Sequence, residues 1–443
     1  MNKTITNEMT HSIEELRELD KKHYLHPSSS IKQHQEEGPA VIFTEGSGIY
    51  LKDIHGNTVI DGLSCLWNVH IGHGRQELGQ VALEQMSRLA YSSSFTTFSH
   101  EPAIRLTAKL AEKAPGNLNT VFLTSGGSES NDTAFKLVRH YWMLKGKPEK
   151  KKIVSRKRSY HGVAMGATSA TGLEAFRKFT PSTAPDFYHI DNYSVEAFKE
   201  FIESEGADTI AAYISEPIQG TGGVIFPPEN YFIEIKALCE QHDILFIADE
   251  VITGFGRTGT YFAVEQFGIT PDLLCFAKGV TSGYMPLGGV IISETIHNDL
   301  IELSEGTFFH GYTYSGHPTA CVVALKNMEI IEREQLVENA KRMGEELYRG
   351  FRELQQKHAI IGEVRTFGLL GAIELVEDQE TNKRFSEPIA PKLVADLQQR
   401  GLICRGITYE GADSLVFAPP LIITKEQISE IITVLDDAFT VLQ

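Results

Sequence analysis

The sequence predicts an α/β protein: a large domain with a mixed, mostly parallel sheet covered by helices, and a smaller α+β domain. From about residue 75 to 325, apolar runs of four to six residues alternate with amphipathic segments. Runs that are apolar on both faces are typical of parallel strands covered by helices. After about residue 325 the pattern changes to a long amphipathic helix, expected over 324–357, and then to alternating strands and helices.

The elements predict three parts of the chain. We expect a helix over residues 12–22 and short strands over 39–61. The predicted parts are an N-terminal segment that packs with the small domain (1–60), a large domain (61–325) and a C-terminal small domain (326–443). The predicted strands of the large domain are VFLT (121–124), KIVS (152–155), AAYIS (211–215), ILFIA (244–248), LLCFA (273–277) and GGVII (288–292). Ligands of such sheets bind beyond the carboxyl ends of the strands, so the residues after each run are examined first.

Composition excludes several classes of partner. Lys and Arg number 41 against 58 Asp and Glu, a net charge of −17, which disfavours nucleic acid and anionic membranes. The one basic cluster, Lys145–Arg158, is expected to be a solvated helix end and loop. Five cysteines in apolar stretches are typical of buried free thiols, and no apolar leader or membrane-length run is present. We therefore expect a soluble, cytoplasmic protein.

Three strand ends carry candidate functional residues. After VFLT, the segment Ser125–Asp132 (SGGSESND) opens a helix, which is either an anion site or a plain N-cap with nothing bound. Asp249 follows ILFIA, where it is either a counter-ion for a buried cation or a loop cap. The alternation of side chains along a strand puts Asp249 on the same face as Val251, so a flat ligand over Val251 would present its edge to Asp249. Lys278 ends LLCFA, where desolvation favours the neutral amine that Schiff-base chemistry needs, unless its side chain extends to the sheet edge.

Three other motifs do not indicate a function. Gly254–Gly259 (GFGRTG) matches the dinucleotide pattern G-x-G-x-x-G, which suggests a nicotinamide-dependent dehydrogenase. Two carboxylates before these glycines would repel a pyrophosphate, and the following TYFAVEQFG is short for the required helix, so the match is interpreted as false. No G-x-S-x-G supports a hydrolase. Clustered histidines (His70/His73, His310/His317) lack an aligning element and a nearby thiolate, so no metal site is predicted.

In order along the chain, these motifs resemble the class III aminotransferases, pyridoxal-phosphate enzymes of fold type I. The motifs are the glycine/serine segment, Tyr160-His161-Gly162, Glu216-Pro217, Asp249–Gly259 (DEVITGFGRTG), Ala277-Lys278-Gly279 and Thr313–Pro318 (TYSGHP). The resemblance runs from about residue 20 to the C-terminus, and it is strongest to the ω-amino-acid and amine:pyruvate transaminases.

The resemblance implies a role for each matching residue. Lys278 would bond to pyridoxal phosphate and Asp249 would hold the ring's pyridinium proton. Gly127 and Ser128 would bind the phosphate. The remaining assignments are Tyr160 and Val251 on the two ring faces, Glu216 near the ring hydroxyl, His161 at the cofactor, Tyr312 and Thr313 from a neighbouring subunit, and Trp67, Phe95, Val163 and Arg405 at the substrate. A homodimer with shared active sites is thus implied.

Two departures from the family pattern concern the cofactor and the substrate. The phosphate segment, usually Ser-Gly-Ser, reads Gly126-Gly127-Ser128, and Ser28–Ser30 stand where related amine transaminases often have an aromatic residue. Arg405 falls where the family places an arginine that binds the acceptor's carboxylate and otherwise swings out; without the resemblance it reads as a surface arginine.

The expected activity is a ping-pong transfer of an amino group from taurine, β-alanine, γ-aminobutyrate or another amine to a keto acid, with pyruvate favoured. The alternatives are an aminomutase or decarboxylase of the same fold, the dehydrogenase, and a non-catalytic binding protein.

Overall fold

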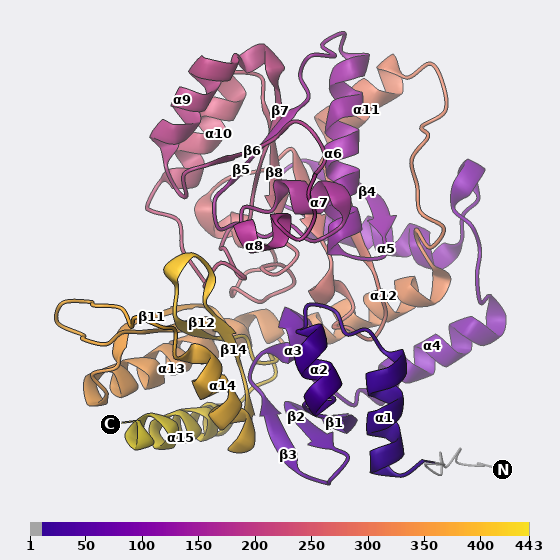
Figure 1. Cartoon of the computed structure of the whole chain (residues 1–443). Coiled ribbons are helices and arrows are strands. Elements are labelled where there is room, and N and C mark those ends of the chain that lie inside the picture. Colours follow the sequence, from indigo (N-terminus) through magenta and orange to yellow (C-terminus); the bar gives the residue numbers. More distant parts are fainter. Residues whose placement is uncertain (1–10, 443) are drawn as a thin grey trace.

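A computed structural model describes residues 11–442, and its largest sheet has seven strands in the order β4-β10-β9-β8-β7-β5-β6 (Figure 1). The strands are β4 (Leu118–Thr124), β5 (Lys152–Arg156), β6 (Phe187–Ile190), β7 (Ile210–Ser215), β8 (Leu245–Asp249), β9 (Leu273–Phe276) and β10 (Gly288–Ser293). All the predicted runs form strands. Strand β6 was missed because it is an edge strand in which only Ile190 is buried.

The sheet is mostly parallel, as predicted, but β10 is antiparallel to both of its neighbours, β4 and β9. The expectation that GGVII forms a parallel strand was therefore wrong. The link from β9 to β10 contains only a short 3-10 turn, η4 (Lys278–Val280), and no α-helix. A parallel connection needs a crossover of about a dozen residues or more, usually helical, so this short link returns the chain in the opposite direction.

Helices cover both faces of this sheet, with α6 and α11 on one side and α9 and α10 on the other (Figure 1). Side chains of β8 alternate between the two layers: Leu245 and Ile247 pack in the core cluster with α6, whereas Phe246 and Ala248 pack in the cluster with α9 and α10. Asp249 follows in this alternation and lies on the α6 face. These helices are α6 (Gly127–Leu144), α9 (Val195–Glu205), α10 (Tyr231–Gln241) and α11 (Glu294–Leu303).

Two four-stranded sheets lie outside the large one, in the orders β1-β2-β3-β13 and β11-β12-β15-β14. Their strands are β1 (Phe43–Ser47), β2 (Tyr50–Asp53), β3 (Thr58–Asp61), β11 (Ile361–Phe367), β12 (Leu370–Leu375), β13 (Leu402–Ile403), β14 (Arg405–Ile407) and β15 (Ser414–Phe417). Strand β13 pairs in parallel with β3, so a C-terminal strand completes the sheet of the N-terminal segment. The domain boundaries at residues 60 and 325 remain predictions.

The helix expected over 324–357 is two helices, α12 (Pro318–Arg333) and α13 (Leu336–Lys357). Gln335 separates them with a φ of 53°, in the left-handed region, which no continuous right-handed helix contains. The other helices are α1 (Ile13–His23), α2 (Ile31–Glu37), α3 (Ser64–Trp67), α4 (Gln76–Arg88), α5 (Glu101–Lys113), α7 (Met165–Ala170), α8 (Glu174–Arg177), α14 (Ala390–Gln399) and α15 (Lys425–Val441). The remaining 3-10 turns are η1 (Phe95–Thr97), η2 (Ala207–Thr209), η3 (Ala263–Phe267) and η5 (Tyr409–Gly411). Within residues 11–442, no helix has the length and apolar character that crossing a membrane requires.

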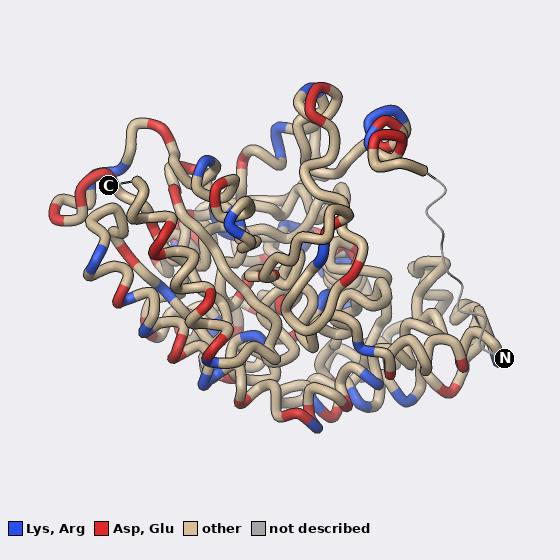
Figure 2. The backbone as a smooth tube through the Cα atoms, turned by 90° about the horizontal axis from the view of Figure 1, so that it is seen from below, with Lys and Arg blue, Asp and Glu red and all other residues tan. Residues whose placement is uncertain are grey.

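Acidic and basic residues are interspersed along the outer helices (Figure 2). Two residues of the basic cluster are not solvated, contrary to expectation. Lys150 is buried and donates from Nζ to the carbonyl oxygens of Ala207 (3.1 Å) and Asp243, and Arg156 is buried beneath Tyr193. Backbone carbonyls and aromatic faces thus compensate both charges in place of water.

All five cysteines are free, and four are buried as predicted. Cys65 is exposed, because α3 is kinked there: the residue has φ 55° and ψ −75°, which turns its side chain out of the helix.

The glycine-rich Gly254–Gly259 segment joins distant parts of the chain and opens no α-helix. Within it, Arg257 is fully buried and donates to the carbonyl oxygens of Leu369 (3.2 Å) and Pro419 and to Ser64 Oγ (3.0 Å). The match to the dinucleotide pattern is therefore false, as the sequence context indicated. Arg257 thus has a structural role: it connects this segment to the Leu369, Pro419 and Ser64 regions of the chain.

We predict that Arg257→Met lowers the free energy of unfolding by about 1–3 kcal/mol, because two buried carbonyl groups lose a charged donor. Differential scanning calorimetry should show a lower thermal midpoint. The matched control is Arg352→Met, at an exposed residue of α13, for which we expect a change within about 0.5 kcal/mol. Equal thermal midpoints for the two variants would contradict this structural role of Arg257.

Candidate active site

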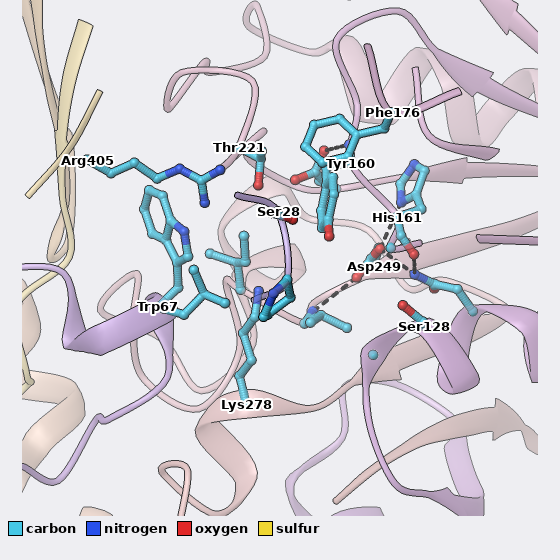
Figure 3. A pocket seen from close by; sticks show the side chains of 18 residues that line it. Ser28, Trp67, Ser128, Tyr160, His161, Phe176, Thr221, Asp249, Lys278 and Arg405 are labelled. Atoms are coloured by element: carbon cyan, nitrogen blue, oxygen red, sulfur yellow. Dashed lines mark hydrogen bonds and ion pairs between the residues drawn. The ribbon is translucent and has the colours of Figure 1, made fainter. Parts of the chain in front are cut away.

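A cavity of about 330 Å³ lies beyond the carboxyl ends of β7, β8 and β9 (Figure 3). Ten of the predicted site residues line it: Trp67, Gly127, Ser128, Tyr160, His161, Glu216, Asp249, Val251, Lys278 and Arg405. Eight further residues line it: Pro27, Ser28, Leu66, Asn131, Gly162, Phe176, Thr221 and Ile252. Of these, Ser28, Gly162 and Ile252 stand in motifs that the sequence analysis named, whereas Leu66, Phe176 and Thr221 were not predicted. The cavity thus forms where parallel-sheet topology places ligands.

One end of the cavity is the N-terminus of α6. Gly126 occupies the N-cap position and supplies no side-chain cap. Among residues 11–442, no acceptor pairs with the backbone N–H groups of Gly127 and Ser128. Gly127 is required by packing, because a Cβ there would lie 2.9 Å from Val251 Cγ1. Free amides at a helix N-terminus form an anion site, so the plain N-cap interpretation is disfavoured.

A buried carboxylate, that of Asp249, lies deeper in the cavity. Its Oδ2 accepts a hydrogen bond from Asn131 Nδ2 (2.8 Å) and lies 2.8 Å from His161 Nδ1. Its Oδ1 accepts from the backbone N–H of Val251 (3.1 Å). In the described part of the chain no lysine or arginine forms an ion pair with it. The carboxylate is therefore held in place with its negative charge available to a cationic ligand group.

Asn131 is the functional residue that sequence reasoning most clearly missed. Its amide joins Asp249 to the backbone oxygen of His161 (2.7 Å) and so fixes both partners of the carboxylate. The signal for it was present: Asn131 stands four residues after Gly127, hence on the same face of α6.

Lys278 lines the cavity and so does not extend to the sheet edge. Its φ is 45°, a strained conformation for a non-glycine residue, and such strain is concentrated at functional sites. Burial lowers the pKa of its amine to about 8, while Asp249 and Glu216 act in the opposite direction. The residue therefore supplies a partly neutral amine near neutral pH, as Schiff-base chemistry requires.

The cavity contains a second buried carboxyl group, Glu216. It accepts from the backbone N–H groups of Tyr160 (2.9 Å) and Gly220 (3.1 Å). Burial raises the pKa of Glu216 to about 7. Behind it, Arg156 Nη2 donates to the backbone oxygen of Glu216 (2.8 Å) and fixes the strand end. Glu216 is thus able to hold or release a proton near neutral pH.

Arg405 projects from β14 into the cavity beside Trp67 (Figure 3). No hydrogen bond or ion pair joins its guanidinium to any residue from 11 to 442. The indole Nε1 of Trp67 is likewise buried without a partner. Two unpaired donors in one wall favour a substrate that carries an anionic group.

Four predicted site residues lie outside this cavity. Phe95 is 48% exposed on η1, and Val163 is 58% exposed, with its backbone N–H donating to Ser128 Oγ (3.1 Å). Tyr312 donates to the backbone oxygen of Glu129 (3.3 Å), and exposed Thr313 accepts from Tyr91 (2.8 Å). Their assigned roles remain predictions.

Three of the four clustered histidines make contacts within loops or caps, although His70 Nε2 is buried without a hydrogen-bond partner among the described residues. His70 Nδ1 lies 3.2 Å from the backbone oxygen of Phe255, His310 contacts Thr133 and Lys136, and His317 caps α12. The expectation that no thiol is near was wrong for His73, whose Nε2 lies 3.9 Å from Cys65 Sγ because the kink in α3 brings the two together.

The cavity fits pyridoxal phosphate on its own chemistry. Free amides of α6 would hold the phosphate, Asp249 would pair with the protonated ring nitrogen, and Lys278 would bond to the aldehyde carbon. The Gly127 and Ser128 N–H groups have no acceptor among residues 11–442, and no lysine or arginine there forms an ion pair with Asp249, so these groups suit an anionic phosphate and a protonated ring.

The comparisons with known proteins agree with this chemistry. A family model described as Aminotransferase class-III matches residues 31–439. The putrescine–pyruvate aminotransferase of Pseudomonas aeruginosa is 39% identical, over 98% of this chain and 97% of its own length. A transaminase structure from the marine bacterium Virgibacillus has a TM-score of 0.95 and 53% identity, covering 96% of this chain and 98% of that one. The structure of the omega transaminase from Pseudomonas jessenii in complex with PMP has a TM-score of 0.91 and 37% identity, covering 96% and 98%.

We predict that capture of pyridoxal phosphate by the cofactor-free chain becomes faster as the pH rises to about 8, the pKa of Lys278, and then levels off. The neutral amine is the reactive form, so below its pKa the rate should rise about tenfold per pH unit. Stopped-flow absorbance measures the capture rate. The control is Nα-acetyl-lysine, whose rate should keep rising to its ordinary pKa of about 10.4. A protein rate that rises in parallel with this control would contradict the lowered pKa.

Proposed function

Because the chain belongs to the class III aminotransferases, which depend on pyridoxal phosphate, we propose that it transfers an amino group from an ω-amino acid or amine to a keto acid, with pyruvate as the acceptor. The unpaired Arg405 guanidinium in the cavity wall carries this proposal. One cavity must accept two substrates in turn, a donor and a keto acid. A single mobile cation suits a keto acid's carboxylate and need not contact an uncharged donor.

When bound, the cofactor supplies an electron-withdrawing ring that takes up the electron pair left as a carbon–hydrogen bond breaks. Asp249 keeps the ring nitrogen protonated, and Asn131 and His161 hold its carboxylate in position. Lys278, once displaced by the donor's amine, would take the proton from the donor carbon as a neutral base and, once protonated, would deliver it as an acid to the cofactor carbon that had carried the aldehyde. Hydrolysis and reaction of the acceptor in the reverse sense complete a ping-pong cycle.

The choice of donor depends on the mouth of the cavity. Pro27 and Ser28 line it, so small side chains stand where related amine transaminases often have an aromatic ring. The P. aeruginosa relative is named for putrescine, a diamine without a carboxylate, and for pyruvate. These observations support an amine or diamine donor, with taurine, β-alanine and γ-aminobutyrate as the other candidates of the class.

The proposal is tested by a donor screen with pyruvate, in which alanine is quantified. We expect at least one amine or diamine without an acidic group to give alanine in a one-to-one ratio with its carbonyl product. Lys278→Ala should abolish turnover. A reaction that needs no keto acid, or that releases carbon dioxide, would instead favour the aminomutase or decarboxylase of the same fold.

The role of Arg405 is separable by half-reaction kinetics. Arg405→Ala should raise the pyruvate KM about 10- to 150-fold, since a charge-assisted bidentate pair is worth about 1.5–3 kcal/mol. Donors without an acidic group should react in their half-reaction as before, whereas donors with a carboxylate or sulfonate should be impaired. The control is Arg400→Ala, which removes an arginine paired with Asp396 on α14. Equal losses for donors with and without an acidic group would show that Arg405 serves only the local structure.

We also propose a homodimer with shared active sites. The segment around η1 lies along residues 308–316: Tyr91 donates to the Thr313 oxygen (2.8 Å) and Ser94 to the Ser315 oxygen (2.9 Å). Exposed aromatic side chains gather there, namely Tyr91, Phe95, Phe98, Phe308, Phe309 and Tyr314. Such a patch supports a protein interface, and this would bring Tyr312 and Thr313 to the partner's cofactor site. A monomeric mass in sedimentation velocity would contradict it.

A further inference from the structure

The N-terminal helical hairpin forms part of the cavity wall without an apolar core of its own. Helices α1 and α2 contain no buried residue. Polar contacts join them: Arg17 donates to the backbone oxygens of Glu37 and Pro39, and Gln35 donates to that of Lys21. The loop between the helices, residues 24–30, nevertheless brings Pro27 and Ser28 to the active-site cavity. Its position must depend on local polar interactions.

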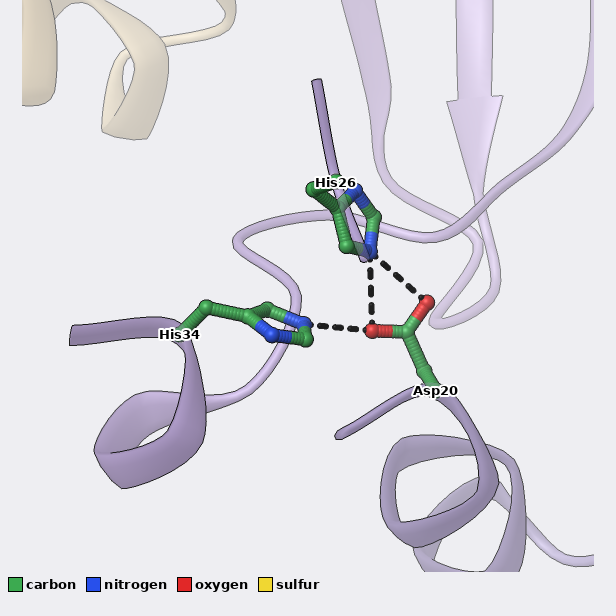
Figure 4. Close-up of side chains that lie close together, drawn as sticks. All are labelled: Asp20, His26 and His34. Atoms are coloured by element: carbon green, nitrogen blue, oxygen red, sulfur yellow. Dashed lines mark hydrogen bonds and ion pairs between the residues drawn. The ribbon is translucent and has the colours of Figure 1, made fainter. Parts of the chain in front are cut away.

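Three metal-ligating side chains converge at the base of this loop (Figure 4). Asp20 lies in the last turns of α1, His26 in the loop and His34 in α2. Asp20 Oδ1 lies 3.0 Å from His26 Nε2 and 2.6 Å from His34 Nε2. One ligand atom from each residue lies within 4.8 Å of the other two. The side chains are only 11–28% exposed.

We propose that Asp20, His26 and His34 bind a divalent transition-metal ion of the zinc type, with water completing its coordination. Two imidazole nitrogens and a carboxylate oxygen are a ligand set that zinc prefers over magnesium or calcium. Ligand atoms of a tetrahedral site with bonds of about 2.0–2.1 Å are about 3.3 Å apart, so the side chains need to move by less than about 1 Å. In the part of the chain that the structure describes, no lysine or arginine forms an ion pair with Asp20. A divalent ion would supply that positive charge.

Simple hydrogen bonding is the alternative for this cluster. The rings of His26 and His34 are 4.5 Å apart between centroids, and each directs its Nε2 at Asp20 Oδ1. An ion at the centre satisfies all three groups at once, and it also ties α1, the loop and α2 together. The ion would thereby fix Pro27 and Ser28 at the cavity.

A second cluster, Asp61, Cys65 and His73, also brings ligand atoms together. It is less suited to a metal ion, because Asp61 already accepts the backbone N–H groups of Leu63 and Cys65. It provides an internal comparison for the experiment.

The test uses the full chain loaded with pyridoxal phosphate and treated with a chelator that is then removed. Isothermal titration with Zn²⁺ alone measures stoichiometry, and Co²⁺ reports coordination through its visible absorption. The variants are Asp20→Asn and His34→Gln at the proposed site and His73→Gln at the second cluster. The matched control is His23→Gln, an exposed histidine one turn from Asp20. Circular dichroism and the cofactor absorbance establish that each variant is folded.

We expect the unsubstituted chain and His23→Gln to bind one equivalent of Zn²⁺, and both site variants to bind at least tenfold more weakly. Bound Zn²⁺ should slow tryptic cleavage after Lys32 severalfold in the unsubstituted chain but not in His34→Gln. Absence of Zn²⁺ binding would overturn the proposal in favour of hydrogen bonding. Binding that His34→Gln retains and His73→Gln loses would assign the ion to the second cluster. Unchanged cleavage with Zn²⁺ bound would overturn the proposed effect on the loop.

Discussion

The structure of the active site depends on one buried negative charge, the carboxylate of Asp249. Burying such a charge without a partner costs several kcal/mol, so its surroundings must be arranged to hold it. Asn131 from α6, His161 from the loop after β5 and the Val251 backbone N–H all contact it. These contacts set the distance between α6 and the sheet, and the free amides of α6 therefore face the same cavity. In the described residues no lysine or arginine pairs with this charge, and the protonated ring of the cofactor would compensate it.

The residues that sequence analysis identified share a local signature. Asp249 and Lys278 each end an apolar run, where a charge is informative because burial is expensive. The glycines of α6 and the order of the motifs then indicated the family. The strands of the central sheet were predictable for the same reason, since their apolar runs are buried on both faces. The features that were predicted correctly are those that a short stretch of sequence contains, namely its residue types and its hydrophobic period.

The residues that were missed depend on contacts between distant segments. Phe176, in α8, packs edge-on against Tyr160, and Thr221 reaches the cavity from the loop after β7. Nothing in their own neighbourhoods distinguishes them from ordinary loop residues. The direction of β10 and the break in the helix at Gln335 were not predicted, for a different reason. Apolar periodicity indicates which residues are buried, but it indicates neither the direction of a strand nor a single residue in the left-handed region.

The pairing of β13 with β3 has a consequence for synthesis of the protein. When the ribosome has synthesised the chain as far as Lys278, one edge of β3 is still unpaired. Its partner residues, Leu402 and Ile403, are synthesised more than 120 residues later. Unpaired strand edges template association with other chains. The N-terminal sheet therefore lacks its fourth strand until almost the whole polypeptide has been synthesised. The strand that closes it is followed within two residues by Arg405, so the edge strand and the proposed substrate-binding arginine are synthesised together.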